Sequence, residues 1–341
     1  MDSAAGEASI VGLFAELIPT LGLGFLIGRQ RPAWTRPLAT PLVRFGVPVS
    51  VMGLLLKGGI HSDLALIALF AASAIAAWML MIQLVPRQIR PVVHPTLQIG
   101  SALGNTAYFG IPVALALLPS DALPVSIGYD LGATLLAWSL GPFWLRRGTS
   151  QDDSTVPQAT AADGHRLLSE LIGHLFASPA SRGLIGALIV QVTPWQTEVA
   201  AALWMPSRFV ISLALVVVGM RLGALQDHSD AAAIAAASRP AKTHAGDDGL
   251  RNALLSKLLL FPAWLGLLSC CLPFMPLTRQ ALVLQGAAPA AISVLLMAEE
   301  AGRGTTQAAR LILLSTMLAL VSVPLWWFVI LRPLGTLGTS G

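Results

Sequence analysis

The apolar stretch 94–119 constrains the fold most strongly, because it is long enough to cross a membrane yet contains residues that weaken helices. Asn105 and Pro112 lie near its middle, beside Gly104 and Gly110. In hydrocarbon every backbone N–H and C=O must be satisfied within the protein, so an interrupted helix survives only against other protein or beside a wet cavity. The stretch therefore predicts a polar site about halfway across a membrane.

The composition places the chain among membrane proteins. Of its 341 residues, 55% are hydrophobic and 11% are charged, whereas a soluble domain is about 25% charged. Lys and Arg are scattered singly between apolar runs, which argues against a nucleic-acid-binding surface. The two cysteines, Cys270 and Cys271, are adjacent within an apolar run and indicate neither a disulfide framework nor a metal site.

Hydropathy divides the chain into membrane-spanning helices of about 20 residues each. The polar segments 146–180 and 225–250 are expected to be mobile surface loops, and the first separates a five-helix repeat in 1–145 from a second one in 181–341. We expect ten helices, at 8–28, 38–57, 63–85, 94–118, 122–145, 181–195, 199–223, 251–273, 277–298 and 306–331.

Basic residues predict the orientation of the helices. Those that follow odd-numbered helices are Arg29, Arg31, Arg36, Arg87, Arg90, Arg146, Arg147, Arg166, Arg239, Lys242 and Arg303. Those that follow even-numbered helices are only Lys57, Arg279 and Arg332. By the positive-inside rule, segments 146–180 and 225–250 are cytoplasmic and both termini lie outside a plasma membrane or bacterial inner membrane.

An odd number of helices in each half implies that the second half is inserted upside down relative to the first, as in many secondary transporters. The fourth helix of the second half should then also be broken. It is the ninth helix overall, and Gln285, Gly286 and Pro289 lie near its centre. The alternative is that these prolines are incidental, since the chain has 23 of them and prolines are common in membrane helices. The fold class is thus an all-α polytopic membrane protein.

Four short motifs carry a family resemblance: Asn105-Thr-Ala-Tyr-Phe-Gly-Ile-Pro112, Tyr129-Asp130-Leu, Ala-Ala-Pro289 and Glu299-Glu300-Ala-Gly302. They resemble the auxin efflux carrier family, which includes bacterial organic-acid permeases. The resemblance implies two inverted five-helix repeats, similar to sodium/proton antiporters and bile-acid symporters. In that fold the fourth and ninth helices would unwind at their prolines and cross in an X beside a scaffold domain. Plant carriers of the family often have an Asn near the second crossing, whereas the nearest amide in this sequence is that of Gln285.

A helix broken at midplane exposes half-helix N-termini, whose unpaired N–H groups and partial positive charge attract anions. Asn105 and Gln285 could orient such a substrate by neutral hydrogen bonds, or could instead join neighbouring helices. By the resemblance, Pro112 and Pro289 would be the breakpoints. The expected substrate-binding residues are Asn105, Thr106, Tyr108, Gly110, Pro112, Gln285, Pro289 and Ser293.

The ionisable residues within the predicted helices include Asp130, Arg208 and Lys257. Asp130, in the fifth helix, could carry a coupling proton, form a salt bridge or cap a neighbouring broken end. Arg208, in the seventh, could pair with an acid or help to draw in anions. Lys257 lies within two turns of the cytoplasmic end of its helix, so we expect its amine to extend to water.

These features favour a secondary carrier that moves a small organic anion, a carboxylate or an auxin-like molecule, by alternating access at a crossed-helix site. The alternatives are a sodium-coupled symporter of the bile-acid-symporter type and an ion channel, although no filter-like motif or ring of charges is evident. No HExxH motif occurs, and we expect no catalytic residues, metal or cofactor. The expected partners are the anion and the lipid bilayer, with a homodimer left open and nucleic acid excluded.

Overall fold

The structure is a computed structural model that describes residues 18–60, 62–86, 89–146, 173, 179–237 and 244–331. Within these ranges the chain is helical, apart from short connections and one isolated β-bridge. The sequence predicts both termini on the outer side of the membrane. These termini, like most of the predicted linker 146–180, lie outside the described residues.

The first half of the chain contains a helix at 18–30, followed by elements that run into one another or turn sharply. These are η1 (Pro32–Trp34), α2 (Thr35–Pro41), η2 (Leu42–Gly46), α3 (Val47–Gly58), α4 (Ser62–Leu84), α5 (Pro95–Ala102), η3 (Thr106–Gly110), α6 (Ile111–Leu117), η4 (Ser120–Ala122) and α7 (Leu123–Arg146).

The second half is likewise built of helical elements, several of which follow one another directly. Its elements are α9 (Pro179–Gln191), α10 (Gln196–Ala237), α11 (His244–Leu255), η6 (Ser256–Leu260), α12 (Phe261–Cys270), α13 (Pro276–Ala287), α14 (Ile292–Glu300), α15 (Thr305–Leu325) and η7 (Trp326–Leu331). Four helical segments of the described chain are long and apolar enough to cross a membrane by length and composition. They are Asp63–Leu84, Gln196–Ala224, Asp248–Cys270 and Thr305–Phe328.

The prediction of a loop at 225–250 is wrong for most of that segment. Helix α10 continues to Ala237, and α11 begins at His244. The run at 231–237 consists of alanines around a single isoleucine, and alanine has the highest helix propensity of all residues. Low hydropathy in this segment therefore marks the end of the apolar span but not the end of the helix.

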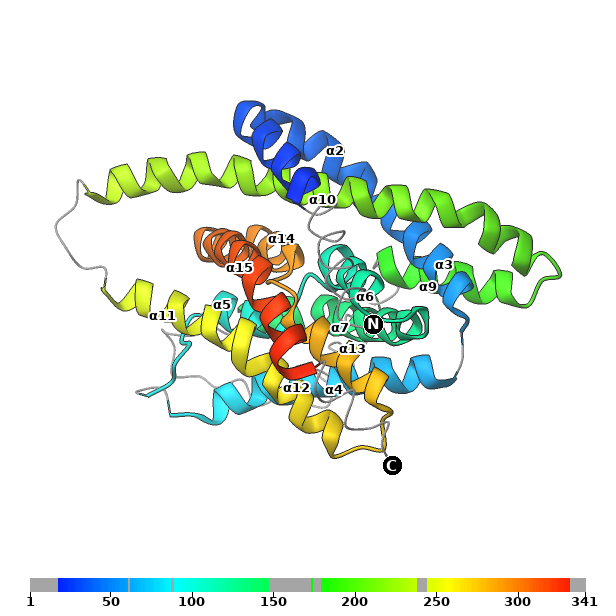
Figure 1. Cartoon of the computed structure of the whole chain (residues 1–341). Coiled ribbons are helices and arrows are strands. Elements are labelled where there is room, and N and C mark those ends of the chain that lie inside the picture. The colour runs from blue at the N-terminus through cyan, green and yellow to red at the C-terminus, as the bar shows by residue number, and fades with distance from the viewer. Residues whose placement is uncertain are drawn as a thin grey trace.

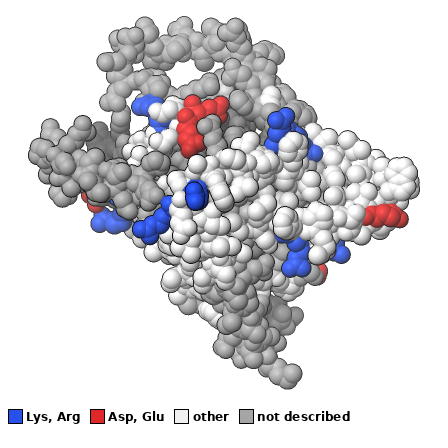
Figure 2. Space-filling view, turned by 90° about the horizontal axis from the view of Figure 1, so that it is seen from above, with Lys and Arg blue, Asp and Glu red and all other residues white. Residues whose placement is uncertain are grey.

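The helices form two packed groups (Figure 1). In the first group, α10 packs on α2 and α3, and α9 packs on α3; α10 and α2 lie along the top of that view and α3 and α9 at its right. Below α10 lies a larger group that contains α4, α7, α12 and α15, together with the interrupted helices α5–α6 and α13–α14. We call the first group the scaffold layer and the second the core layer. Figure 2 shows that most of the visible described surface is uncharged, with basic and acidic side chains gathered in a few places.

Glycines bring α10 unusually close to the helix at 18–30. A methyl group added at Gly24 or Gly28 would collide with the backbone of α10, and one added at Gly219 or Gly223 would collide with the backbone of 18–30. Glycines four residues apart on facing membrane helices let the backbones approach and gain van der Waals contact. The helix at 18–30 therefore joins the scaffold layer through close backbone packing on α10.

Both stretches that the sequence predicts to be interrupted are interrupted, and their breaks pair with each other. The first break is the extended segment 103–105, and the second is 288–291. The N–H of Asn105 donates to the carbonyl oxygen of Pro289 at 2.7 Å, and the N–H of Ala291 donates to that of Leu103 at 3.0 Å. These bonds form an antiparallel bridge, so each break satisfies backbone groups that the other leaves free.

The first break does not lie at Pro112, contrary to the prediction. Pro112 is near the start of α6, within a helix that continues from η3. The wider five-residue turn η3 precedes it, as η2 precedes Pro48 and η6 precedes Pro262. A π-turn accommodates a proline without ending the helix, since it changes the hydrogen-bonding pattern locally. Pro289, in contrast, lies inside the second break, as predicted.

Candidate functional site

A cavity of about 140 Å³ lies where the two breaks face the scaffold layer. Leu42 and Val47 line it from η2 and α3, and Ala214, Val217 and Val218 line it from α10. The core layer contributes both breaks and one face of α7. These core residues are Leu103, Gly104, Asn105, Thr106, Ala107, Tyr108, Asp130, Ala133, Thr134, Ala137, Trp138, Ala291, Ile292, Ser293 and Leu296.

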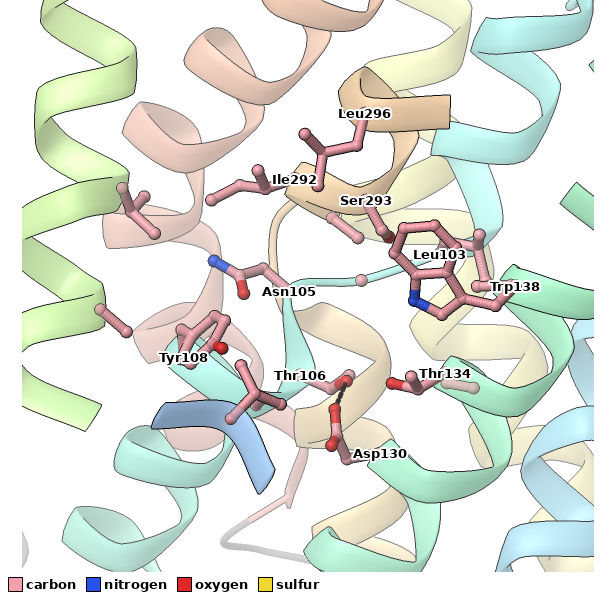
Figure 3. A pocket seen from close by; sticks show the side chains of 18 of the residues that line it. Leu103, Asn105, Thr106, Tyr108, Asp130, Thr134, Trp138, Ile292, Ser293 and Leu296 are labelled. Atoms are coloured by element: carbon pink, nitrogen blue, oxygen red, sulfur yellow. Dashed lines mark hydrogen bonds between the residues drawn. The ribbon is translucent and has the colours of Figure 1, made fainter. Parts of the chain in front are cut away.

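The starts of two half-helices line this cavity. Asn105 and Thr106 open the segment that runs through η3 into α6, and Ala291 and Ile292 open α14. In Figure 3 the Asn105 amide lies near the middle of the drawn side chains, with Tyr108 and Thr106 on one side and Ile292 above it. The first N–H groups of a helix have no intrahelical partner and carry a partial positive charge. The cavity therefore favours a negatively charged guest.

Asp130 supports the start of the first half-helix. Its carboxylate accepts a hydrogen bond from the Thr106 hydroxyl, drawn dashed in Figure 3, and another from the backbone N–H of Ala107. The side chain is 7% exposed and lines the cavity. Of the roles that the sequence left open, the cap on a broken helix end is the one this geometry matches. A proton on Asp130 would change the charge of the cavity wall.

Arg221 is a cavity residue that the sequence reasoning missed. It projects from α10 and is half-buried, and within the described residues its guanidinium has no hydrogen bond or ion-pair partner. Glu299, at the end of α14, is near enough to attract it. Arg208, which the sequence suggested for attracting anions, is exposed on the same helix and does not line the cavity. An arginine with free donors is the side chain best suited to bind a carboxylate.

The predicted site residues divide into two sets. Asn105, Thr106, Tyr108, Ser293 and Asp130 line the cavity. The others, Gly110, Pro112, Gln285 and Pro289, do not.

Two of this second set form a separate contact at the crossing. A methyl group at Gly110 would collide with the Gln285 amide, so these residues touch. Gln285 is fully buried, and neither amide atom has a hydrogen-bond partner among the described residues. No hydrogen bond to a described residue therefore fixes the Gln285 side chain in its position beside the crossing.

Lys257 does not extend to water, contrary to the prediction. Its side chain is completely buried beside the crossing, and its amine donates to the carbonyl oxygen of Gly286 at 2.6 Å. The helix that carries it begins at His244, so Lys257 lies well inside that helix. The sequence placed the start of this helix several residues too late.

A second, smaller cavity of about 20 Å³ continues beyond the first along α3. The two cavities share Val47, Ala107, Tyr108 and Asp130 as walls. Tyr108 therefore lies between them, together with the capped start of the first half-helix. Elsewhere in the described residues, no cluster of three or more His, Cys, Asp or Glu side chains could hold a metal ion.

The chain is similar in sequence to known membrane transport proteins. A family model described as membrane transport protein matches residues 60–327, which include both breaks and the Asp130 helix. An uncharacterized transporter from Methanothermobacter thermautotrophicus is 26% identical over 231 residues. That match covers 67% of this chain and 66% of the relative, just under two thirds of its length.

Proposed function

The chain belongs to the membrane transport protein family, the auxin efflux carrier family, and from that premise we propose that it is a secondary carrier for a small organic anion. The observation that carries the proposal is the cavity at the crossing, where two half-helix N-termini converge with Arg221, which has no ion-pair partner among the described residues. Asn105 and Ser293 add neutral hydrogen-bonding groups that can orient the anion without the cost of another buried charge.

The size and lining of the cavity favour a compact anion with an apolar body. A cavity of about 150 Å³ in another protein accommodates benzene, so about 140 Å³ suits a molecule of similar size. Leu103, Trp138, Ile292 and Leu296 supply apolar wall, and Arg221 supplies the positive charge. These features support a small monocarboxylate, of the bacterial organic-acid type, more than a large or multiply charged substrate.

Alternating access would follow from the position of the cavity between the two layers. Residues of α3 and α10 form one wall and the paired breaks form the other, so a shift of the core layer along the scaffold would move the site. The antiparallel pairing of the breaks supports a fold of ten helices in two inverted repeats. The smaller cavity beyond Tyr108 marks the direction in which the path would continue.

The membrane potential allows export without a coupled ion. Moving one negative charge out of a cell with a negative interior gains about 2.3 kcal/mol per 100 mV. Uptake would require a coupled proton or sodium ion, and Asp130 is the acidic side chain in the cavity that could carry a proton.

The direct test is transport in proteoliposomes with a panel of labelled monocarboxylates and dicarboxylates. We expect saturable flux of at least one monocarboxylate of about benzoate size, faster when the membrane potential drives the anion, and slower flux of dicarboxylates. Protein-free liposomes are the control. Absence of carboxylate flux would contradict the proposal, and flux that never saturates would favour a channel.

Asp130→Asn should remove the pH dependence of anion binding. An ionised Asp130 repels an anion in the same cavity, so wild-type affinity should rise as the pH falls and the carboxylate becomes protonated. Asparagine keeps an oxygen that can accept from Thr106 and Ala107 but stays neutral at every pH. The affinity at each pH can be measured by competition with an aromatic sulfonate. A sulfonate stays ionised over the whole pH range, so the ligand itself does not titrate.

Asp121 provides the matched control, because it is exposed and lies just before α7, the helix that carries Asp130. Asp121→Asn should keep the wild-type pH profile. A profile for Asp130→Asn that is as steep as that of wild type would show that another group binds the proton.

A further inference from the structure

The amine of Lys257 lies between the two breaks in the core layer, outside the residues that line the anion cavity. It donates to the carbonyl oxygen of Gly286, in the last turn of α13. A methyl group added at Gly104, in the first break, would be 3.2 Å from the same amine. The ring of Phe261, one turn along the helix from Lys257, faces the amine with its centroid 4.9 Å away.

The surroundings of this amine are suited to a cation, although no carboxylate supplies the counter-charge. Within the described residues, no acidic side chain forms an ion pair with Lys257. Two half-helices, α5 and α13, end at Ala102 and Ala287, next to the breaks that flank the amine. The C-terminal end of a helix carries a partial negative charge of about half a unit, and an aromatic face also attracts cations.

Helix ends of this kind have a general role in carriers built from broken helices. Their N-terminal ends point at anionic substrates, while their C-terminal ends and unwound carbonyls coordinate a coupling cation. In this chain the N-terminal ends line the anion cavity, and Lys257 lies at the C-terminal end of α13, beside the break that follows α5. Its ammonium therefore lies at the kind of helix end that coordinates a coupling cation in such carriers.

We propose that Lys257 is a built-in cation that fills a monovalent-cation site at the C-terminal ends of α5 and α13, so that the protein folds and works without Na⁺. The site would take Na⁺ or a small alkylammonium only when the lysine is shortened. The inference concerns cation binding at the crossing and does not depend on the identity of the transported anion.

Thermal unfolding of the purified full-length protein in detergent tests the proposal. The midpoint is compared in NaCl, methylammonium chloride and choline chloride at equal ionic strength, for wild type, Lys257→Ala, Lys257→Met and Lys57→Ala. Lys57 is an exposed lysine at the end of α3, whose amine lies over Trp204, and serves as the control.

We expect wild type and Lys57→Ala to unfold at the same temperature in all three salts. Lys257→Ala should unfold several degrees lower in choline chloride and recover part of that loss in NaCl or methylammonium chloride, because either cation fits the vacated space. Lys257→Met should show no recovery, since its side chain fills the space. A folded Lys257→Ala protein that responds to neither cation would overturn the proposal.

The unfolding midpoint of the wild-type protein in the three salts tests the proposal even if Lys257→Ala does not fold. A wild-type midpoint raised by Na⁺ relative to methylammonium and choline would show that the Na⁺ site lies elsewhere and is not replaced by Lys257. An unchanged midpoint, together with a Lys257→Met protein less stable than wild type in every salt, supports the built-in cation. No substrate is present in these measurements, so their outcome is independent of the anion-transport test.

Discussion

Arg221→Gln should raise the KM for the transported anion by about 10–100-fold, with a smaller change in the maximal rate. A hydrogen bond to a charged group contributes about 1.5–3 kcal/mol, and each 1.4 kcal/mol is a factor of ten in affinity. Arg221 is the cationic side chain among the residues that line the cavity, and no described carboxylate is within ion-pair distance of it. Its guanidinium is thus available for the substrate. Concentration series of flux in proteoliposomes would give both kinetic constants.

Arg208→Gln on the same helix is the matched control, because Arg208 is exposed and lies away from the cavity. It removes the same charge from the protein without removing it from the site, and its KM should stay near that of wild type. Arg221→Lys should show an intermediate KM, since lysine keeps the charge but loses the planar pair of donors. Equal effects of Arg208→Gln and Arg221→Gln would mean that the charge acts only at long range.

The sequence was sufficient to locate the second break and to place the first within its stretch, although not at the predicted breakpoint Pro112. Asn105 with its neighbouring glycines, and Gly286 with Pro289, weaken their helices at places that the structure shows to be unwound and paired. Asp130 could also be placed near the first break, because an acid within an apolar span needs a polar partner, and Thr106 provides it. These residues can be recognised in the sequence because each of them is energetically unfavourable in an uninterrupted membrane helix.

Other site residues could not be found from the sequence because hydropathy misplaces the ends of helices. The predicted helix 199–223 ends just after Arg221 and the predicted helix 251–273 begins six residues before Lys257, whereas α10 continues to Ala237 and α11 begins at His244. Polar residues that line a buried cavity lower the local hydropathy of the sequence just as the residues of a loop do. The π-turns add to this, since each inserts a residue and rotates the following face of the helix by about 100°.

Gln285→Met should stabilise the structure described here and slow transport. Both amide atoms of Gln285 are buried without a hydrogen-bond partner in the described part of the chain, and an unsatisfied buried polar group costs about 1–3 kcal/mol. Methionine has a similar length and no such cost, so the thermal unfolding midpoint should rise. A carrier must leave this conformation during each cycle, and stabilising it by about 1.4 kcal/mol makes departure about tenfold less favourable. The maximal rate should therefore fall, with little change in KM.

The matched control is Gln98→Met, because Gln98 lies on α5, the first half of the other broken helix, and is equally buried. Its amide nitrogen donates to the carbonyl oxygen of Val92 at 2.9 Å, and its oxygen accepts from Trp144. The same substitution there removes satisfied hydrogen bonds and should lower the unfolding midpoint. Opposite shifts at the two glutamines would tie the effect to unpaired amide atoms at the crossing. A lower midpoint for Gln285→Met would instead show that its amide is hydrogen-bonded in the membrane.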